Sequence, residues 1–193
     1  SASVGWNLAK ENFFQVDFID DLKLRGSYGS VGNRLGLTNY ASQGTVGFGS
    51  YPGGSSTIPD NVANPDLSWE TTTTTNIGLE LNMFNDRVRL VSDYFIRNTT
   101  DLLFAIPTAD EAGVGSINGN VGDIRNKGLE ISLQADLFRS NDFKWTLGGN
   151  IIFLDHEIVK LPDGEPIDPT ANTFFIRWEE GRLINEHFLI RYA

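Results

Sequence analysis

The side chains of this chain that could do chemistry are few. The densest group is Asp155-His156-Glu157, an acid, an imidazole and a second acid in a row, and such groups serve acid–base catalysis or metal binding when they converge. In a strand, however, neighbouring side chains point to opposite faces of the sheet, and the only other histidine is His187. The sequence therefore predicts no catalytic residue, no metal site and no cofactor, and we expect the chain not to be an enzyme.

Two further stretches match ligand motifs only in part. Gly26, Gly29 and Gly32 lie within and just after a segment with the pattern of a strand, whereas a dinucleotide-binding fingerprint follows a strand and opens a helix. Residues 163–168 contain carboxylates and a glycine but lack the ligand spacing of a calcium-binding loop. In the first case we expect the glycines to weaken the end of a strand that leads into a loop. In the second case we expect a solvent-exposed loop.

Aromatic residues in a long loop are the candidates for substrate binding. Tyr40, Phe48 and Tyr51 lie among glycines and serines between residues 32 and 68. An exposed ring in such a loop could stack on a sugar or pack on a partner protein, because external loops often carry function. The same rings could instead pack on neighbouring loops, and both interpretations stay open.

Strands must position these candidates, because apolar and polar residues alternate along most of the chain, with the period of two that is typical of strands. In residues 129–137, for example, Leu129, Ile131 and Leu133 alternate with Glu130 and Gln134. The clear segments, in each of which the charged residues share one face, are residues 2–8, 22–28, 69–81, 88–97, 129–137 and 143–153. Fainter candidates are residues 173–179 and 186–192. The sequence predicts an all-β fold.

Short and long connections alternate between these segments. Residues 85–87 and 140–142 are tight joins containing Asn and Asp, which tolerate the φ values of hairpin turns. Residues 32–68, 98–121 and 155–172 are long and rich in Gly, Pro, Ser and Asn. Because the long connections come at every second position, we expect them all to leave the same end of the sheet. Loops this long are uncommon in compact soluble domains.

Composition excludes several classes of protein. The longest apolar runs, residues 102–106 and 151–154, are far shorter than the ~20 residues of a membrane-spanning helix. Lys and Arg number 15 against 25 Asp and Glu, for a net charge of -10, which argues against nucleic acid as a partner. The chain has no cysteine, so disulfides, zinc–thiolate sites and thiol nucleophiles are excluded.

An outer-membrane β-barrel accounts for these features together, because it has short turns at one end, long loops at the other, an uncharged lipid-facing side and a polar lumen. Aromatic residues also sit near the ends of the apolar faces: Trp6, Tyr28, Trp69, Tyr94, Trp145 and Phe153. The predicted fold is an antiparallel meander that forms part of a large transmembrane β-barrel, with short periplasmic turns and long extracellular loops. The alternative is a soluble secreted β-sandwich that binds carbohydrate through its loop aromatics.

Several motifs, in a fixed order, resemble one family. They are residues 22–33 (LKLRGSYGSVGN), 64–80 (NPDLSWETTTTTNIGLE), 98–103 (NTTDLL) and 120–133 (NVGDIRNKGLEISL). Together they are similar to barrel strands of the SusC/RagA-type TonB-dependent outer-membrane receptors, and the resemblance extends from Leu22 to about Ile167. It implies that residues 1–193 are part of the barrel domain, with the plug domain and the barrel-closing C-terminal strand lying outside this sequence.

The resemblance also implies a function. Receptors of this type import oligosaccharides or peptides across the bacterial outer membrane, with energy from the TonB complex and together with a SusD-like surface lipoprotein. The expected partners are therefore that lipoprotein, the TonB complex through parts of the chain not present here, the substrate, and outer-membrane lipid. A barrel enzyme ranks last, because no nucleophile, base and orienting group can be assembled from these residues.

Overall fold

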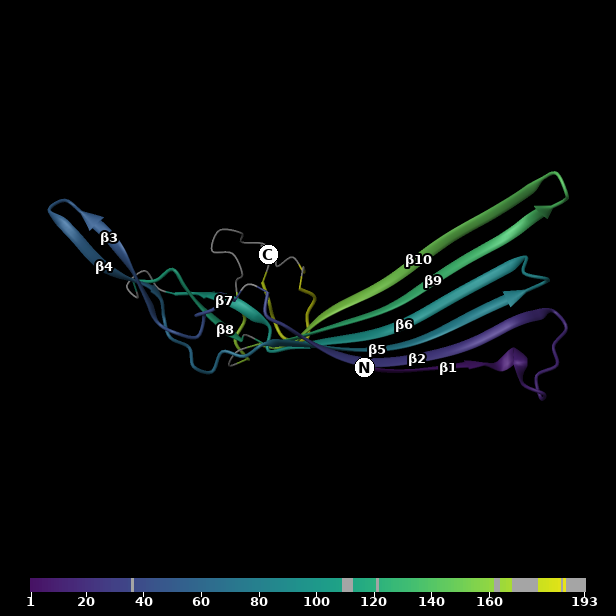
Figure 1. Cartoon of the computed structure of the whole chain (residues 1–193), viewed down its shortest axis with the longest axis horizontal. Helices are drawn as coiled ribbons and strands as arrows, with labels where there is room; N and C mark the ends of the chain where they lie inside the picture. Colours follow the sequence, from purple (N-terminus) through teal and green to yellow (C-terminus); the bar gives the residue numbers. More distant parts are fainter. Residues whose placement is uncertain are drawn as a thin grey trace, which may run out of the picture. The chain divides into compact units, whose positions relative to one another are not determined.

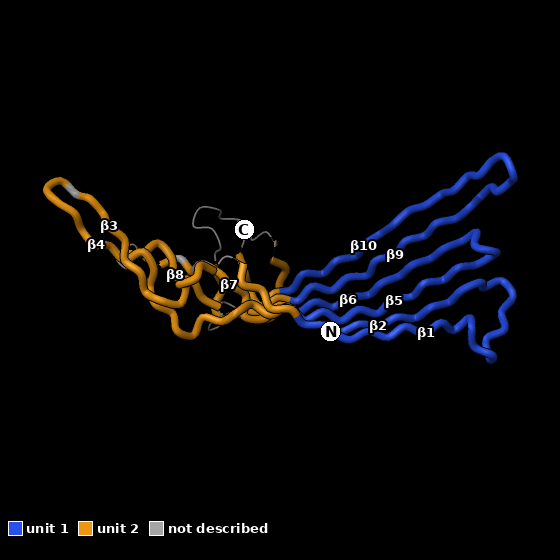
Figure 2. The backbone as a smooth tube through the Cα atoms, in the orientation of Figure 1, with its two compact units in different colours: residues 1–30, 73–98, 125–157 blue, residues 31–72, 99–124, 158–193 orange. Residues whose placement is uncertain are grey.

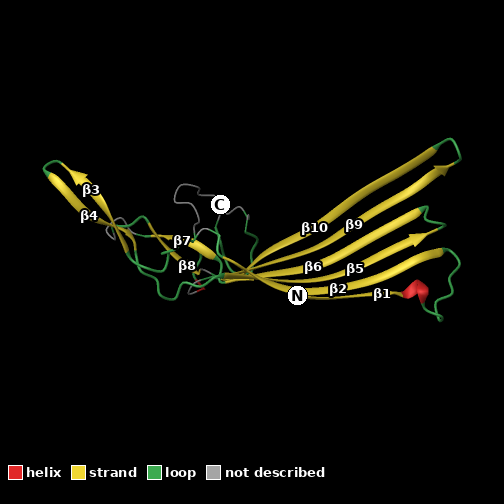
Figure 3. Ribbon diagram, in the orientation of Figure 1, coloured by secondary structure: helices red, strands yellow, loops and turns green. Residues whose placement is uncertain are grey.

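The structure, a computed structural model, has β-strands as its main regular secondary structure. It describes residues 1–35, 37–108, 113–120, 122–161, 164–167, 177–184 and 186. The long strands are β1 (Ala2–Asn7), β2 (Ile19–Asn33), β5 (Glu70–Met83), β6 (Val88–Thr100), β9 (Asp123–Arg139) and β10 (Lys144–Lys160). The shorter ones are β3 (Thr45–Tyr51), β4 (Gly54–Asn61), β7 (Leu103–Pro107) and β8 (Ser116–Asn120). One 3-10 turn, η1 (Leu8–Lys10), follows β1 (Figure 3).

The long strands form one sheet in the order β1-β2-β5-β6-β9-β10 (Figure 1). β1 pairs antiparallel with β2, with Val4 opposite Gly26 and Trp6 opposite Leu24. Two separate hairpins, β3–β4 and β7–β8, are inserted between β2 and β5 and between β6 and β9. Strands adjacent in the large sheet are therefore also successive in the chain once the inserted hairpins are set aside, which confirms the predicted antiparallel meander.

The chain divides into two compact units (Figure 2). Unit 1 comprises Ser1–Ser30, Thr73–Asn98 and Arg125–Glu157, and unit 2 comprises Val31–Thr72, Thr99–Ile124 and Ile158–Ala193. The fully buried hydrophobic side chains of the described residues, among them Ile158 and Leu161, all belong to unit 2. Unit 1 is thus a sheet without a conventional core among its described residues.

The exposed apolar side of unit 1 decides against the sandwich alternative. In a sandwich, one apolar face packs on a second sheet and is buried. Leu133 and Ile77 are instead 48% and 60% exposed. The aromatic residues that the sequence placed near the strand ends are all exposed as well: Trp6, Tyr28, Trp69, Tyr94, Trp145 and Phe153.

The tight turns form as expected. Phe84, Asn85 and Asp86 have φ values of 60°, 56° and 58°, and Asn and Asp accept this left-handed conformation more readily than other residues with side chains. The turn after β9 closes through a hydrogen bond from Ser140 N to Phe143 O at 2.8 Å. No helix in the described ranges has the length and hydropathy needed to cross a bilayer.

The predicted boundaries and loops need correction. β9 and β10 run to Asp123 and Lys160, well past the alternating apolar stretches, because their backbone pairing continues where the side chains become charged. The first two connections predicted as loops, residues 32–68 and 98–121, also contain the hairpins β3–β4 and β7–β8. Of the fainter strand candidates, Trp178 forms a single bridge with Ile167, whereas residues 173–176 and 187–192 lie outside the described residues.

Candidate functional site

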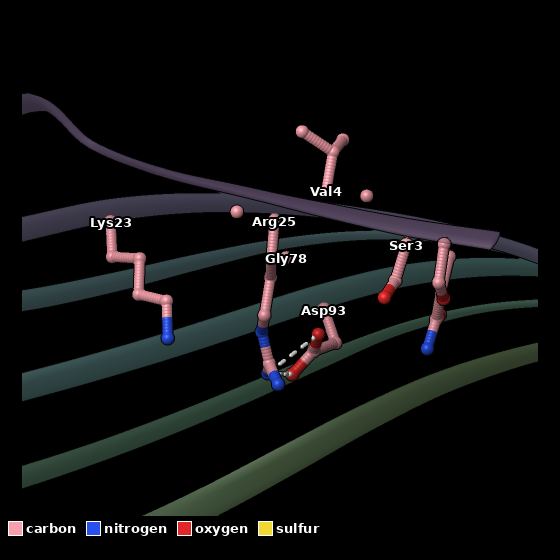
Figure 4. A pocket seen from close by; sticks show the side chains of 10 residues that line it. Ser3, Val4, Lys23, Arg25, Gly78 and Asp93 are labelled. Carbon is pink, nitrogen blue, oxygen red and sulfur yellow. Dashed lines mark hydrogen bonds and ion pairs between the residues drawn. The ribbon is translucent and has the colours of Figure 1, made fainter.

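The sheet of unit 1 has one polar face and one apolar face. Figure 4 shows Lys23, Arg25 and Asp93 on one side of the ribbon and Val4 on the other. This is the alternation of side chains along a strand. We call the side that carries Arg25 and Asp93 the polar face, and the side that carries Val4, Ile77 and Leu133 the apolar face. The candidate site is the polar face, because its charged groups converge.

An ion pair on the polar face joins strands that are not neighbours. Nη2 of Arg25 on β2 donates to both carboxylate oxygens of Asp93 on β6, at 2.9 and 2.7 Å. Nε of Arg25 also lies 3.4 Å from Oε1 of Glu80 on β5. Since β5 separates β2 from β6, the Arg25 side chain must cross β5 to reach its partner. The bridge therefore connects three adjacent strands on one face.

Gly78 of β5 makes this crossing possible. A Cβ atom at position 78 would lie 2.5 Å from Arg25 Nε and 2.5 Å from Asp93 Oδ1. Glycine in a strand interior often marks such a close approach. Gly128 of β9 plays the same part for an apolar contact, because a Cβ there would lie 2.5 Å from the Phe95 ring and 2.9 Å from a methyl carbon of Leu154.

A groove of about 550 Å³ lies on the polar face between these two crossings. Its charged and aromatic lining residues include Arg25, Asp93, Phe95, Arg97, Glu130 and His156. Arg97 and Glu130 have no ion-pair partner within the described part of the chain, whereas Nδ1 of His156 lies 2.6 Å from Oδ1 of Asn126. The lining of this groove can bind polar groups, but it does not bring together a nucleophile, a base and an orienting group.

The acid-imidazole-acid run is divided between the two faces, as the sequence predicts. His156 lines the polar groove, while Asp155 and Glu157 lie on the other side and pair with Lys127 at 3.2 and 3.7 Å. Within the described ranges, no group of three or more His, Cys, Asp or Glu side chains could hold a metal ion. Asp163 and Asp168 of the acidic loop, and His187, lie outside those ranges.

The predicted binding aromatics belong to unit 2. Tyr40 lies in the turn before β3 and is 63% exposed, and Phe48 lies in β3 and is 88% exposed. Neither packs against another aromatic ring of the described residues. The backbone of Tyr51 ends β3, but its side chain lies outside the described part. The structure thus leaves both described rings accessible and does not bring them together.

Sequence reasoning missed the residues that organise the polar face. Arg25 and Asp93 were assigned to one face, but their pairing across an intervening strand depends on the register of β2, β5 and β6, which is a long-range property. The one local signal was Gly78, a glycine in the interior of a strand.

Comparison with known proteins assigns the chain to a family. The family model described as TonB dependent receptor-like, beta-barrel, matches residues 1–182. The chain belongs to this family. TonB-dependent receptor P3 of Formosa agariphila is 34% identical over 204 aligned residues, which cover 100% of this chain and 20% of that protein. TonB-dependent receptor SusC of Bacteroides thetaiotaomicron is 33% identical over 179 residues, which cover 87% of this chain and 18% of that protein.

Solved structures of the RagAB importer support the same family assignment. The RagAB peptide importer in its closed-closed state matches with a TM-score of 0.82 and 31% identity, over 93% of this chain and 20% of that one. The open-open state of the same importer matches with a TM-score of 0.77. The SusC/RagA resemblance seen in the motifs is thereby confirmed, together with the all-β barrel fold. The chain spans a fifth or less of the length of each of these relatives.

Proposed function

We propose that the chain forms part of the barrel wall of a SusC/RagA-type TonB-dependent transporter in the bacterial outer membrane. The observation that carries this proposal is the two-faced single sheet of unit 1. Its apolar face is exposed, as at Val4, which is 70% exposed, and its polar face carries the Arg25–Asp93 bridge. Hydrocarbon against one face and a polar lumen against the other accounts for both.

The dimensions of the apolar face support the proposal. On β9 the uncharged positions run from Leu129 to Leu137, which is about 27 Å of strand at ~3.4 Å per residue. A barrel strand is tilted by about 35–45°, so this stretch spans roughly 19–22 Å of an apolar band that is about 25 Å tall in such barrels. Exposed aromatic pairs, Phe18–Phe84 and Phe138–Phe143, lie beside the short turns, where an interfacial girdle would lie.

The proposed cargo is an oligosaccharide or a peptide, taken up together with a SusD-like surface lipoprotein. RagAB is described as a peptide importer, which supports a peptide, whereas the oligosaccharide follows from the resemblance of the motifs to SusC/RagA-type receptors. In this proposal Tyr40 and Phe48, with Tyr51, contact cargo or lipoprotein from the external connection between β2 and β5. The TonB complex engages parts of the transporter outside this chain, and the chain performs no catalysis.

An uptake experiment tests this function. Cells that express the full-length transporter and its lipoprotein are given fluorescent oligosaccharides or peptides, with and without a protonophore that removes the energy source of TonB. We expect uptake that depends on the transporter and stops with the protonophore. The parent protein should leave the outer membrane only in detergent. Recovery of the protein in buffer alone, or uptake that is unchanged without the transporter, would refute the proposal.

The candidate binding residues are tested in the same cells. Tyr40→Ala combined with Phe48→Ala should reduce uptake severalfold while the amount of transporter in the outer membrane stays constant, because both rings are exposed and support no core. Leu35→Ala, at another exposed apolar residue of the same connection, is the matched control. Equal uptake by the double variant and the control would remove Tyr40 and Phe48 from the site.

A further inference from the structure

The apolar face ends abruptly on two neighbouring strands. Along β9 the residues of this face change from Ile131 and Leu129 to Lys127, and along β10 they change from Phe153 to Asp155. Both changes lie toward the ends of the strands that lead into the long connections. The sequence pattern had placed every strand charge on the polar face. The extension of β9 and β10 corrects this, because it adds charged positions to the apolar face.

These added positions form one cluster, which we call the charged cluster: Arg125, Lys127, Asp155 and Glu157. Lys127 Nζ lies 3.2 Å from Asp155 Oδ2 and 3.7 Å from Glu157 Oε2. Arg125 Nη1 lies 3.9 Å from Glu157 Oε2, and its Nε donates to Asn98 Oδ1 of β6 at 3.0 Å. The cluster therefore spans β6, β9 and β10, and it lies directly beside the end of the apolar stretch.

The two cations keep donors for another ligand. The Arg125 and Lys127 side chains are 41% and 33% exposed. A guanidinium has five N–H donors, and only Nε of Arg125 makes a hydrogen bond to a described residue. The distances of 3.7 and 3.9 Å to Glu157 are too long for hydrogen bonds. The carboxylates thus hold the cations beside the strands without saturating them.

Charge of this kind marks the edge of a bilayer. Charged side chains are costly against hydrocarbon but favourable at the headgroup level, so the boundary must pass between the level of Leu129 and Phe153 and that of Lys127 and Asp155. Phosphates of lipid headgroups lie at this level, and Arg and Lys bind phosphate through charge-assisted hydrogen bonds. The cluster itself has no net charge, so the fit is one of position and of the N–H donors that Arg125 and Lys127 keep.

We propose that Arg125 and Lys127 bind the phosphate groups of membrane lipids at the loop-side boundary of the bilayer, with Asp155 and Glu157 positioning them. This inference rests on the proposed function, because it requires the apolar face to lie in a membrane. The lipid retained at this site should carry a phosphate, whatever its acyl chains.

Lipid retention by the full-length transporter tests the inference. The protein is placed in nanodiscs that contain phosphatidylglycerol and the phosphate-free lipid digalactosyl diacylglycerol, and the lipids that remain bound are counted by native mass spectrometry. The wild type should retain phosphatidylglycerol in preference, and added salt should reduce this preference. Arg125→Gln with Lys127→Gln should lower it by about fivefold per cation, or about 25-fold together. Lys23→Gln on the polar face is the matched control and should change nothing.

The outcomes separate this inference from the proposed function. Heat-modifiable migration of the folded barrel shows whether each variant is inserted. If the wild-type protein does not insert, the proposed function fails. If the wild type inserts but shows no preference for phosphatidylglycerol, or if the double variant inserts and keeps the preference, only the present inference fails. Should the double variant not insert, Arg125→Lys with Lys127→Arg replaces it, and this pair must retain the preference.

Discussion

Replacing Gly78 by alanine should break the ion pair that crosses β5. The added Cβ would lie 2.5 Å from both Arg25 Nε and Asp93 Oδ1, which is closer than real Cβ contacts come. The nearest atoms, which also include Arg25 Cγ at 2.8 Å, all belong to side chains and none to the backbone, so the whole Arg25 side chain must swing away. The cost of the substitution is then the loss of the Arg25–Asp93 interaction rather than a clash with backbone.

The size of this effect follows from the exposure of the pair. The Arg25 side chain is 42% exposed and that of Asp93 is 22% exposed, so solvent screens the attraction and a partly exposed pair contributes up to about 1 kcal/mol. This pair exceeds that figure, because its two hydrogen bonds are charge-assisted and Asp93 is the less exposed partner, so its loss costs about 1.5–2.5 kcal/mol, of which alanine recovers about 0.5 kcal/mol over glycine in a strand. We expect Gly78→Ala to lower the free energy of unfolding by about 1–2 kcal/mol.

A double-mutant cycle isolates the cause. In a background of Arg25→Ala, the atoms that the new Cβ would meet on Arg25 are gone, so Gly78→Ala should cost nothing or stabilise slightly. The free energy of unfolding of all four proteins is measured by urea titration of the full-length barrel in phospholipid vesicles. An equal cost of Gly78→Ala in both backgrounds would show that the bridge does not explain the glycine.

Other predictions concern the two faces separately. Ile131→Arg should destabilise the inserted barrel by about 2–4 kcal/mol, because it places a charge on the lipid side. Glu130→Gln, at the adjacent position on the polar face, should have a mild effect. Equal free energies of unfolding for the two variants in vesicles would contradict the assignment of the faces. Gly128→Ala should lower the free energy of unfolding by about 1–3 kcal/mol through overpacking, since its Cβ would lie 2.5 Å from the Phe95 ring. Adding Phe95→Leu should restore most of that stability in the same titration.

The sequence was most informative where structure depends on local pattern. The strand around Leu129 and Ile131 could be predicted together with its two faces, because side-chain direction in a strand alternates whatever its neighbours are. The turn at Asn85 and Asp86 was equally accessible, because it depends on the φ preferences of single residues. The alternation of short and long connections and the uncharged face then indicated a barrel rather than a sandwich, and the ordered motifs indicated the family.

The features that were not predicted depend on the register between strands, or have an alternation of side chains that glycine and serine obscure. The hairpin β3–β4 was expected to be loop because its glycines and serines obscure the alternation of Val46 and Phe48, although the Pro52-Gly53 turn was visible and Gly53 has φ 115°. The start of β9 was placed too late and the end of β10 too early, because the strands were bounded where the apolar alternation stops. Backbone pairing continues regardless of side-chain polarity, and this is how charges came to lie beyond Phe153 on the apolar face.

Each inserted hairpin leaves from one strand of the large sheet and returns to the strand next to it: β3–β4 departs from β2 and rejoins at β5, which are hydrogen-bonded neighbours. The backbone pairing of β2 with β5 therefore does not depend on the sequence of the inserted hairpin. Segments of this kind are free to diverge in length and content at little cost to the sheet, so grafting residues 34–69 from another member of the family should preserve the sheet and would test whether, as in the proposed function, this connection contacts cargo.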